Sequence, residues 1–150
     1  MRYFLSYLAL LPAAILCYLP VIHHVRVRKT LLILGGIPLF FFWAAIGGSL
    51  GTRFHVEFYQ WLAPTLPLFA LAFYFSTDLS IWKSISIFLA VGAVFSTIGN
   101  LAVAADALIA PDGSPSLLTI PGCLIFHVMT WGITLAVWYP ATHAARWLLD

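Results

Sequence analysis

Cys123 and His127 are the two residues of this chain whose types and spacing come nearest to a catalytic pair. They lie four positions apart, so on a helix they share one face, and a thiol beside an imidazole is how a nucleophile meets its base. Such a pair also needs a polar pocket and an orienting carboxylate or amide, whereas the residues between them include Leu124 and Phe126. We therefore expect His127 to bond a backbone carbonyl or a nearby threonine. A small Cys/His membrane enzyme of the peptidase kind stays as an alternative.

A second group of small and polar residues recurs at helical spacing, namely Gly92, Ser96, Gly99 and Asn100. One interpretation makes Asn100 a contact for a ligand or a proton. The other makes the stripe a seam where a second helix packs, because small residues let membrane helices approach closely. We expect the seam, with Asn100 hydrogen-bonded across it.

No metal or haem site is expected from the histidines and cysteines. Only His127 lies deep in an apolar stretch, while bis-histidine haem ligation needs a histidine on each of two facing helices. Cys17 and Cys123 both lie in apolar stretches, where a thiol behaves as a small hydrophobic group. We expect no cofactor, no disulfide framework and no enzymatic activity.

The composition places these residues in a membrane protein. Charged residues make up 8% of the chain and hydrophobic residues 63%, with a mean hydropathy of +1.01. A soluble domain has about 25% charged residues. The net charge of +2 is small and the basic residues stand at the ends of apolar stretches, so a nucleic acid is not expected as a partner.

Apolar stretches of the length of a membrane span follow one another along the chain, at residues 3–22, 31–50, 58–76, 84–105 and 117–139. The fourth carries no charge, and at roughly 1.5 Å per residue it covers about 33 Å, close to the thickness of the hydrocarbon core. The first has a basic residue followed by an apolar run, as a signal peptide does, but it is too long and we expect it to be retained. The sequence thus predicts one integral membrane domain, residues 1–150, built as an all-α bundle of five transmembrane helices.

Prolines and glycines predict local features of this bundle. Pro12 should kink the first span, because proline lacks the backbone N–H that a helix interior needs. Gly47 and Gly51 stand four apart and should let another helix approach the second span closely. After Pro140, residues 141–149 are expected to form a short interfacial helix.

The basic residues predict the orientation in the membrane. In a five-span arrangement one side collects Arg26, Arg28, Lys29, Lys83 and Arg146, and the other collects Arg2 and Arg53. Cytoplasmic connections carry the excess of Lys and Arg. We expect a multi-pass protein of the cell membrane, in a bacterium the inner membrane, with its N-terminus outside and its C-terminus in the cytoplasm. The cluster Arg26, Arg28 and Lys29 should set the topology and contact anionic lipid.

Residues 77–109 and 138–150 together resemble the N-terminal multi-span sensor region of GHKL-type sensor histidine kinases. The resemblance is carried by Asp78, Trp82, Lys83, Asp106, Tyr139, Pro140, Arg146 and Trp147. Kinases of this type continue into a dimerising histidine helix and an ATP-binding domain, and these 150 residues hold neither part. The resemblance therefore implies a truncated or free-standing sensor half that phosphorylates nothing itself.

We accordingly expect a non-catalytic membrane protein that acts as a sensor or interaction module of a bacterial signalling system. The expected partners are the lipid bilayer, a membrane or cytoplasmic signalling protein and a second copy of the chain. The loop at residues 106–116 is a place where a peptide or a small amphiphile could be sensed from outside. An oligomeric channel or carrier is the other alternative, although the chain lacks the inverted repeat that is typical of carriers.

Overall fold

The computed structural model describes residues 2–111 and 118–149, and for residues 144–149 the backbone alone. The described residues form helices and connections, with a single isolated β-bridge between Val25 and Thr77. The helices are α1 (Arg2–Leu8), α2 (Leu11–Tyr18), α3 (Lys29–Phe54), α4 (Phe58–Ser76), α5 (Ile81–Ile109) and α6 (Ile120–Leu149). The predicted all-helical class is therefore confirmed.

Three helices are long and apolar enough to cross a membrane, and they indicate that the protein is associated with one. They are α3, α5 and the part of α6 from Ile120 to His143. Helix α4 coincides with the predicted span 58–76, but Gln60, Thr65 and two prolines lower its mean hydropathy, and it is not one of the three. The first predicted span, 3–22, is divided into two short helices.

The division between α1 and α2 lies just before Pro12. Leu10 is the N-cap of α2, and Pro12 occupies the first turn, where its missing N–H is not needed. The predicted kink at Pro12 is thus confirmed as a break. Pro140 behaves differently, because α6 continues through it to Leu149. The expected separate helix at 141–149 is instead the end of α6, since one proline removes only one backbone bond of a long helix.

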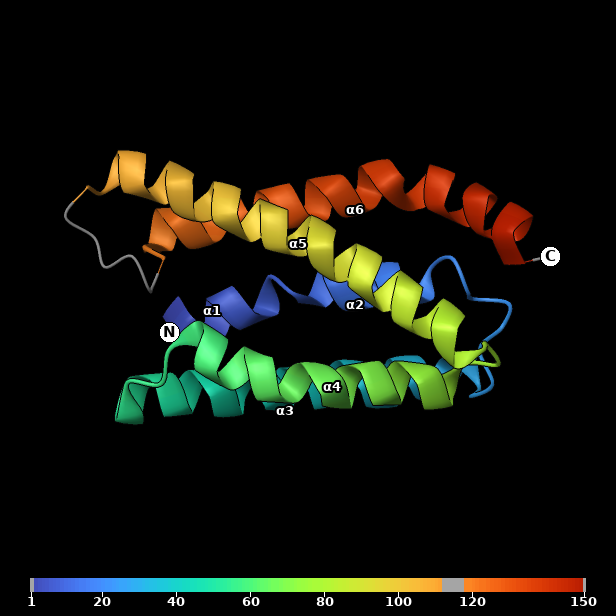
Figure 1. Cartoon of the computed structure of the whole chain (residues 1–150). Coiled ribbons are helices and arrows are strands. Elements are labelled where there is room, and N and C mark those ends of the chain that lie inside the picture. The colour runs from blue at the N-terminus through green and yellow to red at the C-terminus, as the bar shows by residue number, and fades with distance from the viewer. Residues whose placement is uncertain (1, 112–117, 150) are drawn as a thin grey trace.

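The helices form three layers along one long axis (Figure 1). The pair α1 and α2 lies between a layer made by α3 and α4 and a layer made by α5 and α6. The chain runs along this axis five times in alternating directions, counting α1 and α2 as one pass. Between residues 3 and 21 no side chain is exposed, so the first pass is the centre of the molecule.

The core forms where the first pass meets the outer layers. Ala9 packs with Ile98 and Ala102 of α5 and with Phe126 of α6. Further along the first pass, Cys17 and Val21 pack against α4, and Leu16 and Leu19 pack against α5; the aromatic partners there are Phe73 and Phe95. One central pass thus holds the two outer layers together.

The glycines at the end of α3 confirm the predicted close approach of another helix. A Cβ atom at Gly51 would lie 2.6 Å from the ring of Tyr3, and one at Gly47 would lie 2.5 Å from the indole of Trp61. A Cβ atom at Gly48 would lie 3.1 Å from α1. Glycine is needed at these positions because α1 and Trp61 occupy the space that a side chain would fill.

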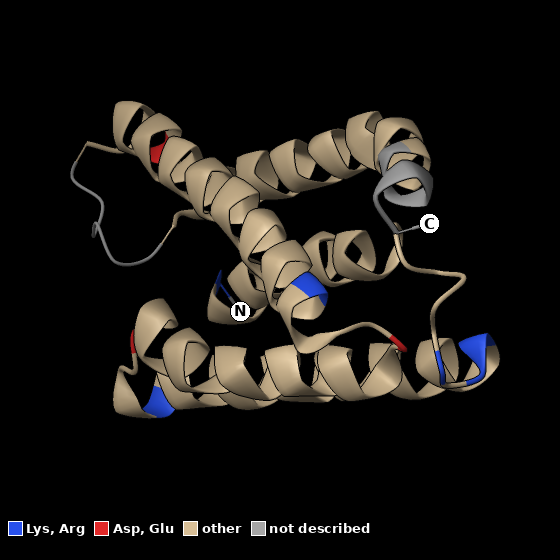
Figure 2. Ribbon diagram, turned by 45° about the vertical axis from the view of Figure 1, so that its right-hand side comes forward, with Lys and Arg blue, Asp and Glu red and all other residues tan. Residues whose placement is uncertain are grey.

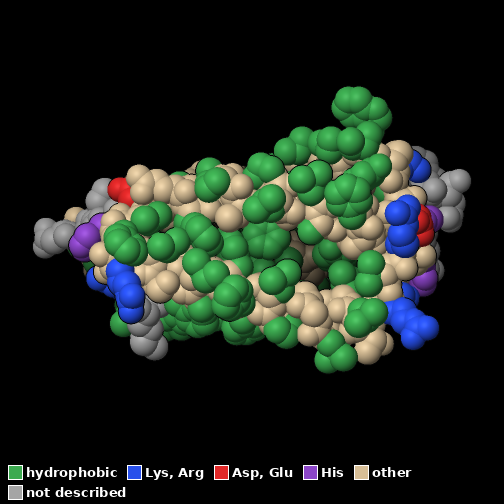
Figure 3. Space-filling model, turned by 90° about the horizontal axis from the view of Figure 1, so that it is seen from below, with side chains coloured by type: hydrophobic (Ala, Val, Ile, Leu, Met, Phe, Trp, Pro, Cys, Tyr) green, Lys and Arg blue, Asp and Glu red, His purple; other side chains and the backbone are tan. Residues whose placement is uncertain are grey.

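Charged residues lie toward the two ends of the long axis (Figure 2). Hydrophobic side chains cover much of the surface between the ends (Figure 3). Large apolar residues such as Leu34, Leu68, Leu89 and Leu135 are each more than 60% exposed along this belt. A belt of this extent would aggregate in water and is suited to a hydrocarbon solvent.

Candidate functional site

The Cys123–His127 face of α6 is occupied by packing contacts with α1. The Sγ atom of Cys123 lies 3.4 Å from the Oγ atom of Ser6, and Cys123 is 1% exposed. The Nε2 atom of His127 donates to the carbonyl of Leu5 at 3.0 Å. The expected bond from His127 to a backbone carbonyl is confirmed, and its partner belongs to α1. The two side chains each face α1, and no hydrogen bond joins them among the described residues.

Asp106 is a buried carboxylate, whereas the sequence predicted it at the start of the outer loop, residues 106–116. It is 7% exposed, and its Oδ2 atom accepts the backbone N–H of Thr119 at 2.8 Å while its Oδ1 atom accepts the hydroxyl of the same residue. A Cβ atom at Gly122 would collide with this carboxylate. Asp106 therefore anchors the start of α6 to α5. The sequence does contain a signal for the start of α6, namely a threonine just before an apolar run, because threonine is a common N-cap.

The small and polar stripe of α5 does not form the expected seam. A Cβ atom at Gly92 would meet nothing within 4 Å, and one at Gly99 would touch only the ring of Phe126 at 3.9 Å. Asn100 is exposed. The helix contacts of α5 are made instead by Phe95, Ile98 and Ala102. The stripe is left open because α4 and α5 do not pack closely along this part of their length.

An apolar cavity of about 360 Å³ lies next to this stripe, and we call it the α4–α5 groove. Its floor is the helix α2, which contributes Ala13 and Cys17. Its two walls are α4 and α5, and the wall residues are Leu62, Leu66, Phe69 and Phe73 on α4 and Val91, Gly92, Phe95, Ser96 and Gly99 on α5. Figure 3 shows the molecule from the side of α3 and α4, and there a hollow is visible among the hydrophobic side chains.

Few polar atoms border the α4–α5 groove. The hydroxyl of Tyr18 lies 2.8 Å from the Oγ atom of Ser76 and is occupied there. Tyr59 at the start of α4 and Ser96 on α5 supply the other two hydroxyls. Among the described residues that line the groove there is no Lys, Arg, His, Asp or Glu. The groove can therefore take a long apolar group with at most a small uncharged polar part.

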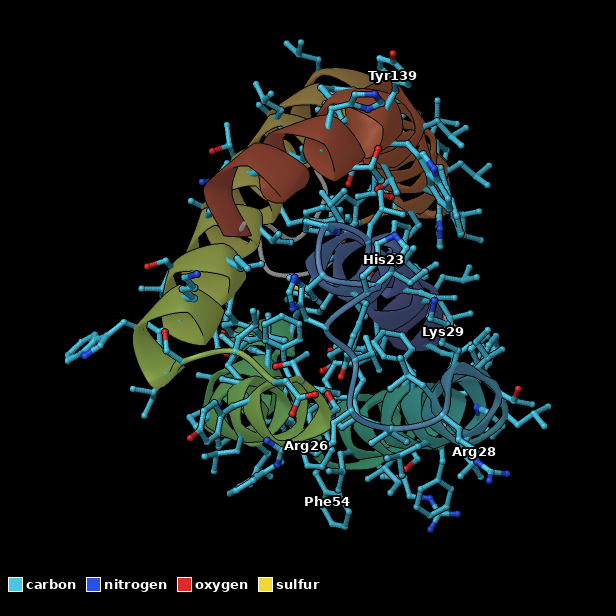
Figure 4. The ribbon with its side chains drawn as sticks, turned by 90° about the vertical axis from the view of Figure 1, so that its right-hand side faces the viewer. His23, Arg26, Arg28, Lys29, Phe54 and Tyr139 are labelled. Carbon is cyan, nitrogen blue, oxygen red and sulfur yellow. The ribbon has the colours of Figure 1, made fainter. Side chains whose placement is uncertain are left out.

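The basic cluster lies at one end of the long axis, and Figure 4 views the molecule from that end. The Nε atom of Arg26 donates to the Oδ1 atom of Asp78 at 2.7 Å, and both side chains are more than half exposed. The backbone N–H of Arg26 donates to the carbonyl of Ser76 at 2.9 Å, and that of Asp78 donates to the carbonyl of His24 at 2.7 Å. The connection before α3 is thus fastened to the link between α4 and α5. Arg28 and Lys29 are exposed at the start of α3.

Within residues 2–111 and 118–143 no group of three or more His, Cys, Asp or Glu side chains is placed to hold a metal ion. The loop expected at 106–116 as a place for an external ligand begins later than predicted, because residues 106–109 belong to α5, and its residues 112–116 lie outside the described part of the chain.

The chain matches no protein-family model, no curated protein and no solved structure. The resemblance to the sensor region of GHKL-type kinases is therefore still an expectation drawn from the sequence.

Proposed function

We propose that this protein is a non-catalytic membrane sensor module that takes up a lipophilic ligand in the α4–α5 groove. The observation that carries the proposal is the groove itself, an apolar cavity of about 360 Å³ on the side of a helical bundle. A catalytic role has less support, because Cys123 and His127 each bond α1. The signalling partner in this proposal is a membrane or cytoplasmic protein.

We propose five membrane crossings. The alternating passes, the charged ends and the apolar belt between them all support this number. Helix α4 has 19 residues and at roughly 1.5 Å per residue is about 28 Å long, close to the thickness of the hydrocarbon core. The first pass is shielded from lipid by the other helices, so its break before Pro12 is acceptable there.

The charges support an orientation with the N-terminus outside. One end of the long axis, where α3 begins and α4 ends, carries four basic residues, Arg26, Arg28, Lys29 and Lys83, and one acidic residue, Asp78. The other end, where α3 ends and α4 begins, carries the basic residues Arg2 and Arg53 and the acidic residues Glu57 and Asp106. The end with the excess of basic residues belongs in the cytoplasm.

A route for a signal leads from the groove to the cytoplasmic end. The wall α4 is joined to α5 by the short link after Ser76, and it contains Pro64 and Pro67. A ligand that separates the walls would move the end of α4, where Asp78 holds Arg26 and the connection to α3. The resemblance of residues 77–109 to a kinase sensor region agrees with this route.

Distance measurements between the walls test the proposal. Spin labels at Leu68 on α4 and Leu89 on α5, both 64% exposed, report the separation. The background carries Cys123→Ala and keeps Cys17, because Cys17 is buried in the floor of the groove. A control pair at Leu101 and Leu124 reports the closely packed helices α5 and α6. Monoolein should change the first distance and leave the second unchanged. If monoolein changes neither distance, the sensor proposal is wrong.

A further inference from the structure

We propose that the α4–α5 groove holds one acyl chain of a bilayer phospholipid, with the ester end of the lipid at Tyr59 and Ser96. The inference rests on the proposed function, because it names the class of ligand that occupies the same groove. It also gives the ligand's direction along the groove.

The chemistry of the lining selects a hydrocarbon chain. Aromatic side chains from five helices border the groove, among them Tyr18 of α2, Trp43 of α3, Phe69 of α4, Phe95 of α5 and Phe126 of α6. A void here would deprive these rings of contact atoms on one side. Water is a poor occupant, because an ordered water needs two to four polar partners. In a bilayer the available filler is the acyl chain of a lipid.

The groove has the length of an extended chain. On α4 its lining runs from Phe58 to Phe73. At roughly 1.5 Å per residue these fifteen steps cover about 22 Å. A chain lying along α4 would contact α4 over this distance, and α5 and the floor over part of it.

The polar side chains of the lining indicate where the ester end of the lipid lies in the groove. Ser96 lies about 22 Å along α5 from Ile81, and Tyr59 lies about 26 Å along α4 from Ser76, at roughly 1.5 Å per residue. Since a short link joins Ser76 to Ile81, both hydroxyls lie toward the end of the groove that is away from this link, one on each wall. Tyr59 is also in the first turn of α4, where a tyrosine favours the membrane interface. Hydroxyl groups there can donate to an ester carbonyl.

The absence of charge from the described lining predicts no preference for the headgroup. Arg26, Arg28 and Lys29 lie at the other end of the long axis from Tyr59. At the end of Tyr59 the two basic residues Arg2 and Arg53 are balanced by Glu57 and Asp106. The groove should therefore retain phosphatidylcholine and phosphatidylglycerol equally.

Native mass spectrometry of the full chain, purified in mild detergent after reconstitution with each lipid, tests the inference. Gly92→Leu places a side chain in the groove, and Gly132→Leu is the matched control, because a Cβ atom meets nothing within 4 Å at either position. We expect one retained lipid in the unaltered protein and in Gly132→Leu. Gly92→Leu should weaken retention roughly 10- to 100-fold, because the leucine displaces several methylene groups of the chain.

A second measurement examines the ester end. The double change Tyr59→Phe and Ser96→Ala should weaken retention roughly 2- to 10-fold, the usual worth of a hydrogen bond. Equal retention in Gly92→Leu and Gly132→Leu would mean annular lipid only and would overturn the inference. If the unaltered protein forms a dimer and Gly92→Leu abolishes that dimer, a second copy of the chain occupies the groove. This result would also overturn the inference. Retained lipid without wall movement would overturn the sensor proposal alone.

Discussion

The contact between Gly51 and Tyr3 gives a quantitative test of how α1 packs on α3. A Cβ atom at Gly51 would lie 2.6 to 2.9 Å from three ring atoms of Tyr3 and from no other side chain as closely. Forcing a methyl group into a packed contact costs about 1–3 kcal/mol. Replacing glycine by alanine within a helix contributes about 1 kcal/mol of stability in return. Gly51→Ala should therefore lower the free energy of unfolding by roughly 0–2 kcal/mol.

Removing the ring should reverse the sign of this effect. In a Tyr3→Ala background the same Gly51→Ala change meets open space and should stabilise the protein by up to about 1 kcal/mol. The coupling free energy between the two positions is then about 1–3 kcal/mol. Gly35→Ala is the control on the same helix, because a Cβ atom there meets nothing within 4 Å. It should stabilise both backgrounds equally.

The assay is unfolding by sodium dodecyl sulfate in mixed micelles, followed by circular dichroism for all four members of the cycle. A coupling free energy near zero would refute the reasoning, because it would mean that Tyr3 does not occupy the space beside Gly51.

Three further changes have expected outcomes in the same unfolding assay. Asp106→Ala should lower the free energy of unfolding by about 1–3 kcal/mol, because it leaves the N–H and the hydroxyl of Thr119 without their acceptor; an unchanged value would contradict the anchoring of α6. Arg26→Ala should lower it by less than about 1 kcal/mol, since the ion pair with Asp78 is more than half exposed; a larger loss would show that the pair is worth more than its exposure implies. Cys123→Ala should cost about 1 kcal/mol or less and leave the monoolein response of the melting temperature unchanged, because the thiol only packs against α1; loss of that response would contradict this role.

The sequence predicted those features that depend on one residue type or on a simple pattern. The break at Pro12, the close approach at Gly47 and Gly51 and the carbonyl bond of His127 all follow from local chemistry. The helical class follows from the apolar stretches, of which three have the length and hydropathy of a span in the structure.

The arrangement of the helices could not be predicted in the same way. In a membrane protein every face of a helix is apolar, so the pattern does not tell which face meets a neighbour. The stripe from Gly92 to Asn100 therefore looked like a packing seam although it borders the groove. Asp106 likewise appeared to end a span, because its partner Thr119 lies 13 residues further along the chain.

The central position of the first pass has a consequence for biogenesis. Helices α1 and α2 leave the ribosome before the helices that will enclose them, and between residues 3 and 21 every side chain ends up at least partly covered. In the five-crossing arrangement that we propose, this segment enters the bilayer with its short, interrupted helices still uncovered. The first helix made after it is α3, which packs on it through the glycines that admit Tyr3 and Phe4. The order of assembly that we propose therefore starts from the hairpin of the first pass and α3.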